Sequence, residues 1–111
     1  MKTSTLTGAD LNRAVALALG HEVVCADDDP TDFAMIVEGY VVRIPNYATD
    51  ITAAWPIIVA NKIELAHNGF IWCARGTSPP TLWQKDDDPI TAAMRCFVAS
   101  VFGDDVNLEN T

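Results

Sequence analysis

The chain has 111 residues, half of them hydrophobic and a fifth charged, with a formal net charge of -8 at pH 7. This composition is typical of one folded domain rather than of a disordered chain. The negative charge repels phosphate backbones, which disfavours generic DNA or RNA binding, and no apolar run is long enough to span a membrane. The short apolar run at residues 14–19, with Arg13 against it, does not fit a signal peptide.

The cysteines and histidines form no metal-binding pattern. Three cysteines, Cys25, Cys73 and Cys96, are an odd number without a CxxC pair, which favours a reduced cytoplasmic setting. His21 lies four residues from Cys25, and His67 lies six residues from Cys73, whereas structural zinc sites use tighter paired spacings. We therefore predict neither a metal site nor a cofactor.

The first elements are indicated by capping residues and apolar periodicity. Thr7 followed by Asp10 resembles a capping box, and apolar residues then recur at helical spacing until Gly20. We predict a helix over this stretch and a strand at residues 22–26. The acidic segment 27–32 is expected to be a solvated loop.

Two hairpins are expected. The segments FAMIV and YVVRI flank Glu38-Gly39, which predicts a hairpin over residues 33–44. The clearer one covers residues 62–75, because Asn68-Gly69 is a preferred two-residue turn. That turn places three pairs on one face: His67 with Phe70, Leu65 with Trp72, and Ile63 with Ala74. Cys73 would lie on the opposite face.

Proline and cap signals define the remaining helices. Thr49 or Asp50 can cap a short turn, and we place Pro56 at the first position of a helix over WPIIVAN. Residues 76–88 contain two adjacent prolines and an Asp run, and they are expected to form a loop.

The last helix has a full set of boundary signals. Asp88 is its cap, Pro89 fits its first turn, and Gly103 ends it. Residues 104–111 are expected to be a loose tail, which gives one domain with an ordered core over residues 5–103. These elements predict an α+β fold, with an antiparallel sheet of three to five strands and the N- and C-terminal helices packed on one face.

Three blocks resemble the NinX-like proteins of lambdoid phages and prophages, a family without an established function. The blocks are LTGADLNRAVALALGHE at 6–22, YATDITAAWPII at 47–58, and DPITAAMRCFVASVFGDDV at 88–106. They cover a little under half of the chain in matching order. The resemblance implies a phage or prophage origin and expression in the cytoplasm of a bacterial host.

The middle block departs from the family pattern. The family tends to have Trp directly after the Thr-Asp pair and Gly-Gly before the proline, whereas here Ile51 follows Asp50 and Ala54-Trp55 precede Pro56. If the family Trp lines a site, either Trp55 replaces it or the site is altered. The resemblance implies no catalytic residues.

Arg95 is the one charge in the otherwise apolar or small-residue last helix. A guanidinium there must be paired or hydrated. It could clamp a carboxylate or phosphate, or it could form a structural ion pair with one of the fifteen acidic residues. The helix also has a face of small residues that suits a homodimer: Ala92, Cys96 and Ala99.

A second candidate site lies ahead of the middle helix. Thr49 and Asp50 read either as a helix cap or as ligand groups beside free backbone N–H groups. Asn46, Tyr47 and Trp55 are close in sequence and could supply hydrogen bonds and stacking. Separately, Trp83 in its proline-rich loop is the tryptophan expected to be exposed and to anchor a partner.

These features favour a non-catalytic binding protein used by a phage inside its host. The hypothesis is that it captures a small anionic ligand, such as a nucleotide-type defence signal, near Arg95, Tyr47 and Asp50. The alternative is an effector that docks on a host or phage protein through an acidic surface and Trp83. An enzyme is disfavoured because no nucleophile–base or metal constellation is recognised in the sequence.

Overall fold

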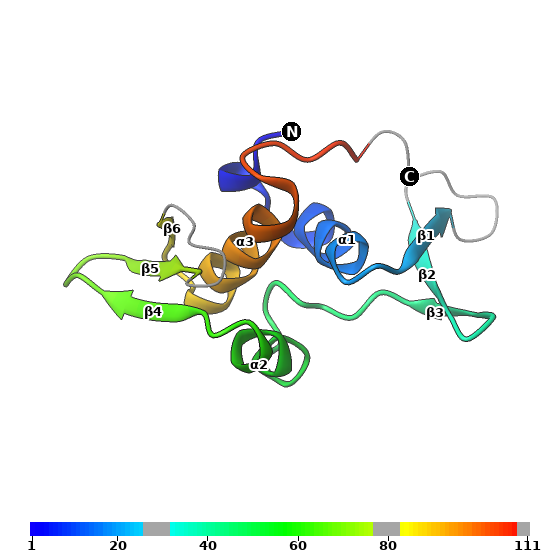
Figure 1. Ribbon diagram of the computed structural model, residues 1–111, viewed down its shortest axis with the longest axis horizontal. Helices are drawn as coiled ribbons and strands as arrows, with labels where there is room; N and C mark the ends of the chain where they lie inside the picture. Colours follow the sequence, from blue (N-terminus) through cyan, green and yellow to red (C-terminus); the bar gives the residue numbers. More distant parts are fainter. Residues whose placement is uncertain (26–31, 77–82, 109–111) are drawn as a thin grey trace.

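A computed structural model of the protein describes residues 1–25, 32–76 and 83–108. Its elements follow one another along the chain as shown in Figure 1: η1 (Thr3–Thr5), α1 (Gly8–Ala18), β1 (Glu22–Cys25), β2 (Phe33–Val37), β3 (Tyr40–Arg43), α2 (Ile51–Ala60), β4 (Glu64–His67), β5 (Trp72–Arg75), β6 (Gln84–Asp86) and α3 (Pro89–Phe102). Within these residues, none of the helices has the length and apolar character needed to cross a membrane. The acidic segment predicted to be a loop lies mostly outside them.

The C-terminal helix α3 is the centre of the molecule. Every residue from Thr91 to Val98 is buried, and α3 packs against α1, α2, β5 and β6. Its predicted boundaries are confirmed: the Asp88 side chain accepts a hydrogen bond from the Ile90 amide at 3.1 Å, and Gly103 ends the helix with a φ of 82°. A helix that is apolar all round is stable only when other elements cover all its sides.

The strands form two antiparallel sheets, with strand orders β1-β2-β3 and β4-β5-β6. The predicted α+β class is confirmed, and so is the packing of the first and last helices on each other and on strands. Instead of one sheet, however, the strands divide between the two ends of the molecule, with α1 and α3 between them (Figure 1). The two sheets cover the α1–α3 pair from different sides: α1 contacts β1, whereas α3 contacts β5 and β6.

The first hairpin is confirmed. Val37 pairs with Tyr40, so Glu38 and Gly39 form the two-residue turn. Both turn residues have positive φ, 52° for Glu38 and 84° for Gly39. The favoured two-residue hairpin turn requires this conformation at both positions, and a glycine at the second adopts it without strain.

The second hairpin forms with a different register. His67 pairs with Trp72 and Leu65 pairs with Ala74, so four residues, 68–71, make the turn instead of two. The Asn68 side chain stabilises the longer turn, because its carbonyl oxygen accepts hydrogen bonds from the amides of residues 70 and 71. The shift is two residues, so Leu65, Trp72 and Ala74 still share a face, and Cys73 still lies on the other face.

The middle helix α2 begins earlier than predicted. Asp50 is its N-cap, with the side chain accepting from the Thr52 amide at 3.0 Å, and Pro56 lies inside the helix rather than at its start. Pro56 lacks the backbone N–H that would donate a hydrogen bond to the Thr52 carbonyl, and both residues are exposed to solvent. Burial of Ala54, Ile57 and Ile58 on the inner face favours helix across the whole segment.

Two predictions about chain ends and loops are corrected. The segment predicted as a loop contains β6, a short strand without apolar residues that pairs with the free edge of β5. Residues 104–108 are not a loose tail, because Asp105 bridges to Lys2 while Val106 and Leu108 are only 4% and 6% exposed. The tail is held by contacts with the N-terminus that no local pattern announces.

The buried tail predicts a stability effect at Leu108. We expect Leu108→Ala to lower the free energy of unfolding by about 2 kcal/mol, because it removes a buried side chain and leaves a cavity. Leu19→Ala is the matched control: Leu19 is 40% exposed, and the loss should stay below about 1 kcal/mol. Urea unfolding measures both, and equal losses would show that the tail does not contribute to the core.

Candidate functional site

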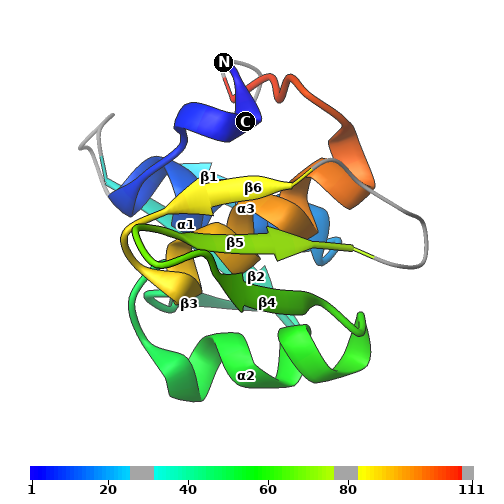
Figure 2. The same cartoon turned by 90° about the vertical axis from the view of Figure 1, so that its left-hand side faces the viewer.

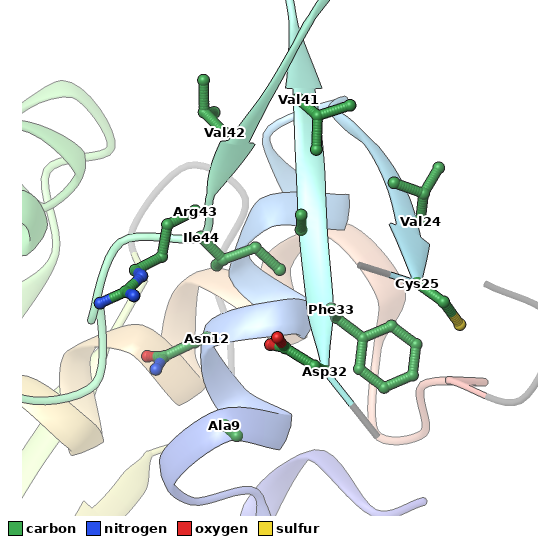
Figure 3. Close-up of a pocket in the computed structure, with 11 residues that line it drawn as sticks. Ala9, Asn12, Val24, Cys25, Asp32, Phe33, Val41, Val42, Arg43 and Ile44 are labelled. Carbon is green, nitrogen blue, oxygen red and sulfur yellow. The ribbon is translucent and has the colours of Figure 1, made fainter. Parts of the chain in front are cut away.

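A hollow of about 630 Å³ lies between the first turns of α1 and one end of the β1-β2-β3 sheet. We call it the α1 hollow. Its wall is drawn in Figure 3 and consists of Ala9, Asn12, Val24, Cys25, Asp32, Phe33, Ala34, Val41, Val42, Arg43 and Ile44. The end of β1, the start of β2 and the end of β3 meet there, because neighbouring antiparallel strands alternate in direction. Its volume falls in the range of small-molecule sites.

Asn12 ties the hollow to the loop ahead of α2. Its amide nitrogen donates to the Asn46 side-chain oxygen at 3.1 Å, and its own oxygen accepts from the Ala48 amide at 2.8 Å. These bonds fix the orientation of the Asn12 amide and hold residues 46–48 against α1. The predicted site residue Asn46 is therefore one hydrogen bond away from the wall of the hollow.

Two residues of opposite charge line the hollow. Arg43 comes from the end of β3, Asp32 immediately precedes β2, and both residues are exposed. Among the described residues, neither has an ion-pair partner. Figure 3 shows the Asp32 carboxylate inside the ring of labelled side chains, with Arg43 on the β3 side. A guanidinium and a carboxylate of this kind are available to complementary groups of a ligand.

Phe33 gives the hollow an aromatic wall. The guanidinium carbon of Arg13 lies 3.9 Å from the centre of the Phe33 ring, and the Arg13 side chain is only 12% exposed. A guanidinium nitrogen of Arg13 is 3.7 Å from Asp10, while its Nε is buried without a hydrogen-bond partner in the described part of the chain. One face of Phe33 is thus covered by a cation, and this contact adds positive charge beside the hollow.

Arg95 is held inside the protein. Its Nε donates to the Leu6 carbonyl at 2.7 Å, and one terminal nitrogen donates to the Lys85 carbonyl at 2.7 Å and lies 3.2 Å from the Asp86 carboxylate. Its side chain is 7% exposed. The structure therefore favours the structural ion pair over an anion clamp. In the small-residue face of α3, Ala92 and Cys96 are fully buried, and Ala99 is partly buried.

The residues predicted around Asp50 do not converge on Arg95. Asp50 caps α2, and Thr49 is exposed. Trp55 lies on the outside of α2 with 55% of its surface exposed. Tyr47 is buried, and the loss of hydration raises the pKa of its hydroxyl above the usual value of about 10. In the described residues, Arg95 bonds to residues 6, 85 and 86, which lie outside this loop.

Trp83 is exposed, as predicted, at 40% of its surface. The Arg75 guanidinium lies 4.6 Å from the centre of its ring, and Arg75 is in turn bonded to Glu64 at 2.6 Å. One side of the indole is therefore used within the protein.

The three cysteines differ in setting: Cys25 is exposed in the wall of the hollow, Cys73 is intermediate, and Cys96 is buried.

The sequence prediction missed the residues that line the hollow. Asn12 and Arg13 interrupt the apolar spacing of the first helix, and Arg43 is the only charge in YVVRI. These polar interruptions were the available signal. They become a site only because the helix and the hairpin fold onto each other, and chain order does not reveal that contact.

The buried ion pair predicts a loss of stability when the cation is removed. Arg95→Met leaves two carbonyls without a donor and Asp86 without a counter-ion, so we expect unfolding free energy to fall by about 3 kcal/mol. Arg95→Lys should also destabilise, because one ammonium cannot reproduce the fork geometry. Arg75→Met, which breaks an exposed pair, should cost less than about 1 kcal/mol in the same urea titration. A stable Arg95→Met protein would argue against the structural role.

Tyr47 predicts a loss of stability at alkaline pH. Because burial raises its pKa, the unfolded chain releases this proton at a lower pH than the folded protein does. The contribution of Tyr47 to the free energy of unfolding is then complete below about pH 10 and declines as the pH rises toward the pKa of Tyr47 in the folded protein. Tyr47→Phe should show a shallower decline in unfolding free energy between about pH 9 and 11. Tyr40→Phe, at an exposed tyrosine, is the control, and identical slopes for all three proteins would refute the assignment.

Comparisons with known proteins agree with the resemblance of the three sequence blocks. Curated proteins give no match. A crystal structure of a phage protein from Bacillus cereus ATCC 14579 is similar over 91% of this chain and 88% of that chain, with a TM-score of 0.66 and 20% identity, which shows a shared fold. The family model described as Bacteriophage P22, NinX matches residues 2–101. The chain therefore belongs to the phage NinX family.

Proposed function

We propose that the protein is a non-catalytic binding protein that acts inside the bacterial host and sequesters a small anionic, nucleotide-type ligand in the α1 hollow. A counter-defence role, in which the phage removes a signal nucleotide of its host, fits this activity. One observation carries the proposal: a guanidinium, a carboxylate, an amide and an aromatic ring surround the same space of about 630 Å³.

The lining matches the parts of a nucleotide one by one. Arg43 suits a phosphate, because guanidinium–phosphate bonds are charge-assisted and can be bidentate. Asp32 accepts hydrogen bonds and suits the N–H groups of a base. Phe33 and the neighbouring aliphatic side chains suit the faces of the base. A ligand that carries both an anion and N–H donors satisfies the two opposite charges of the wall, whereas a simple anion would meet Asp32 unfavourably.

The chemistry of the wall favours binding over nucleophilic catalysis. Cys25 is an exposed thiol in the hollow, but the lining residues include no histidine that could activate it. Asn12 is held by two hydrogen bonds to its neighbours, which suits a fixed recognition group rather than a moving one. This arrangement supports a protein that captures a molecule without changing it.

The test is a thermal-shift series with mononucleotides, cyclic nucleotides and dinucleotides, with nucleosides as the phosphate-free controls. We expect at least one nucleotide to raise the melting temperature by several degrees, since ligand at 100 times Kd adds about 2.7 kcal/mol. Arg43→Ala should weaken binding about tenfold or more, because it removes a charge-assisted contact. Arg75→Ala on the other sheet is the matched control. The proposal fails if no nucleotide stabilises the protein or if nucleosides act equally well.

The alternative function, a protein–protein effector, is favoured by one observation. Trp83 is exposed beside two shallow surface depressions, although Arg75 covers one side of its ring. An effector would be captured from infected cells with a single host or phage protein, and Trp83→Ala would release it. Retention of that partner by Trp83→Ala would argue against this alternative.

A further inference from the structure

The middle helix α2 is apolar on two faces, and the protein covers only one of them. Residues 51–60 contain no charged side chain. Ala54, Ile57 and Ile58 are buried against the core. The side of the helix that adjoins this buried face carries Ile51, Trp55 and Val59, which are 49%, 55% and 56% exposed. We call these three residues the outer stripe. A helix with apolar residues on both faces normally has a partner on each.

The outer stripe is a continuous surface on the outside of the molecule. Its residues are four positions apart, and such residues are neighbours along one helix face. Figure 2 shows α2 at one edge of the molecule, beyond β4, with its outer side away from the other elements. Strand β4 is the edge strand of its sheet, and all four of its residues are exposed. The stripe and this edge together form a larger surface than the stripe alone.

We propose that the outer stripe is a homodimer interface, in which α2 of a second copy packs antiparallel across a two-fold axis at Trp55. The stripe is symmetric about its central residue, with Ile51 four positions before Trp55 and Val59 four positions after it. An antiparallel pair therefore places Ile51 against Val59 of the second copy and Trp55 against itself. A two-fold interface requires this self-complementarity.

Charge favours a second copy in this arrangement. Each chain carries a net charge of -8, so two copies repel each other except where the contacting surfaces lack charge. The α2 helix provides such a surface. Its two ends also have opposite charges, with Asp50 at the N-cap and Lys62 two residues after the helix. Antiparallel packing brings each Asp50 toward Lys62 of the second copy, and it aligns the two helix dipoles favourably.

The interface must extend beyond three side chains. Specific interfaces bury more than about 1,000 Å² in total. The exposed edge of β4 lies next to α2 and carries Leu65, which is 37% exposed. A central exposed tryptophan surrounded by aliphatic residues is the composition that dominates binding energy in such interfaces.

Sedimentation velocity and native mass spectrometry test the proposal on the full chain. The unmodified protein should be a dimer at micromolar concentration. Trp55→Asp should weaken dimerisation by at least about 30-fold. The Trp55→Asp monomer should still melt as a folded protein, because Trp55 does not contribute to the core. Phe70→Asp is the matched control, since Phe70 is an exposed aromatic residue, 92% exposed, on a hairpin turn away from α2.

A cross-linking experiment tests the axis itself. In a Cys25→Ser background, Trp55→Cys should form an intermolecular disulfide under mild oxidation, because position 55 meets itself across the two-fold axis. Phe70→Cys should not. A monomeric unmodified protein at high concentration overturns the proposal. So does a dimer that Trp55→Asp leaves intact, or a Trp55→Cys protein that does not cross-link.

Discussion

The buried guanidinium of Arg95 is the interaction on which this fold depends. It extends from the core helix α3 to the Leu6 carbonyl near the N-terminus and to Lys85 and Asp86 on β6. One side chain thus connects the N-terminal segment with β6 and α3, which follow each other along the chain. A cation in such a setting is tolerated only with its hydrogen bonds satisfied, and this requirement orients the segments around α3. The short strand β6 has no apolar residue of its own, so these contacts and its pairing with β5 hold it in place.

Because α3 and its cation occupy the centre, binding surfaces are left to the periphery. The α1 hollow lies at the far end, where α1 meets the β1-β2-β3 sheet, and the Arg95 ion pair makes no contribution to its wall. Its charged residues Arg43 and Asp32 contrast with Arg95, whose Nε and one terminal nitrogen donate to backbone carbonyls. Groups that stabilise the fold are paired within the protein, whereas the groups proposed to bind a ligand have no ion-pair partner in the described residues.

The outer stripe of α2 shares no residue with the described lining of the α1 hollow and raises a separate question of assembly. The face of small residues on α3 first suggested a dimer, but the core buries two of its three residues, Ala92 and Cys96. Three apolar residues that remain exposed lie together on α2, a helix in which Pro56 is accommodated because its inner face is buried. Assembly through α2 and ligand capture in the α1 hollow use different residues, so they are independently testable.

The sequence by itself determined the elements whose signals are local. Asp88, Pro89 and Gly103 defined α3, Glu38-Gly39 defined a hairpin turn, and three blocks indicated the NinX family, because capping, turn geometry and family motifs are carried by neighbouring residues. Tertiary structure alone decided the division into two sheets, the register of the second hairpin, the strand β6 and the docking of residues 104–108. The register of the second hairpin depends on Asn68, whose side chain bonds the amides of residues 70 and 71 inside the turn. The strand β6 depends on its pairing with β5 and on the contact of Asp86 with Arg95, and the docked tail depends on a contact between distant segments, Asp105 with Lys2. The same reason applies to the site. Asn12, Asp32 and Arg43 are unremarkable along the chain and become neighbours only when the first helix packs on the first sheet.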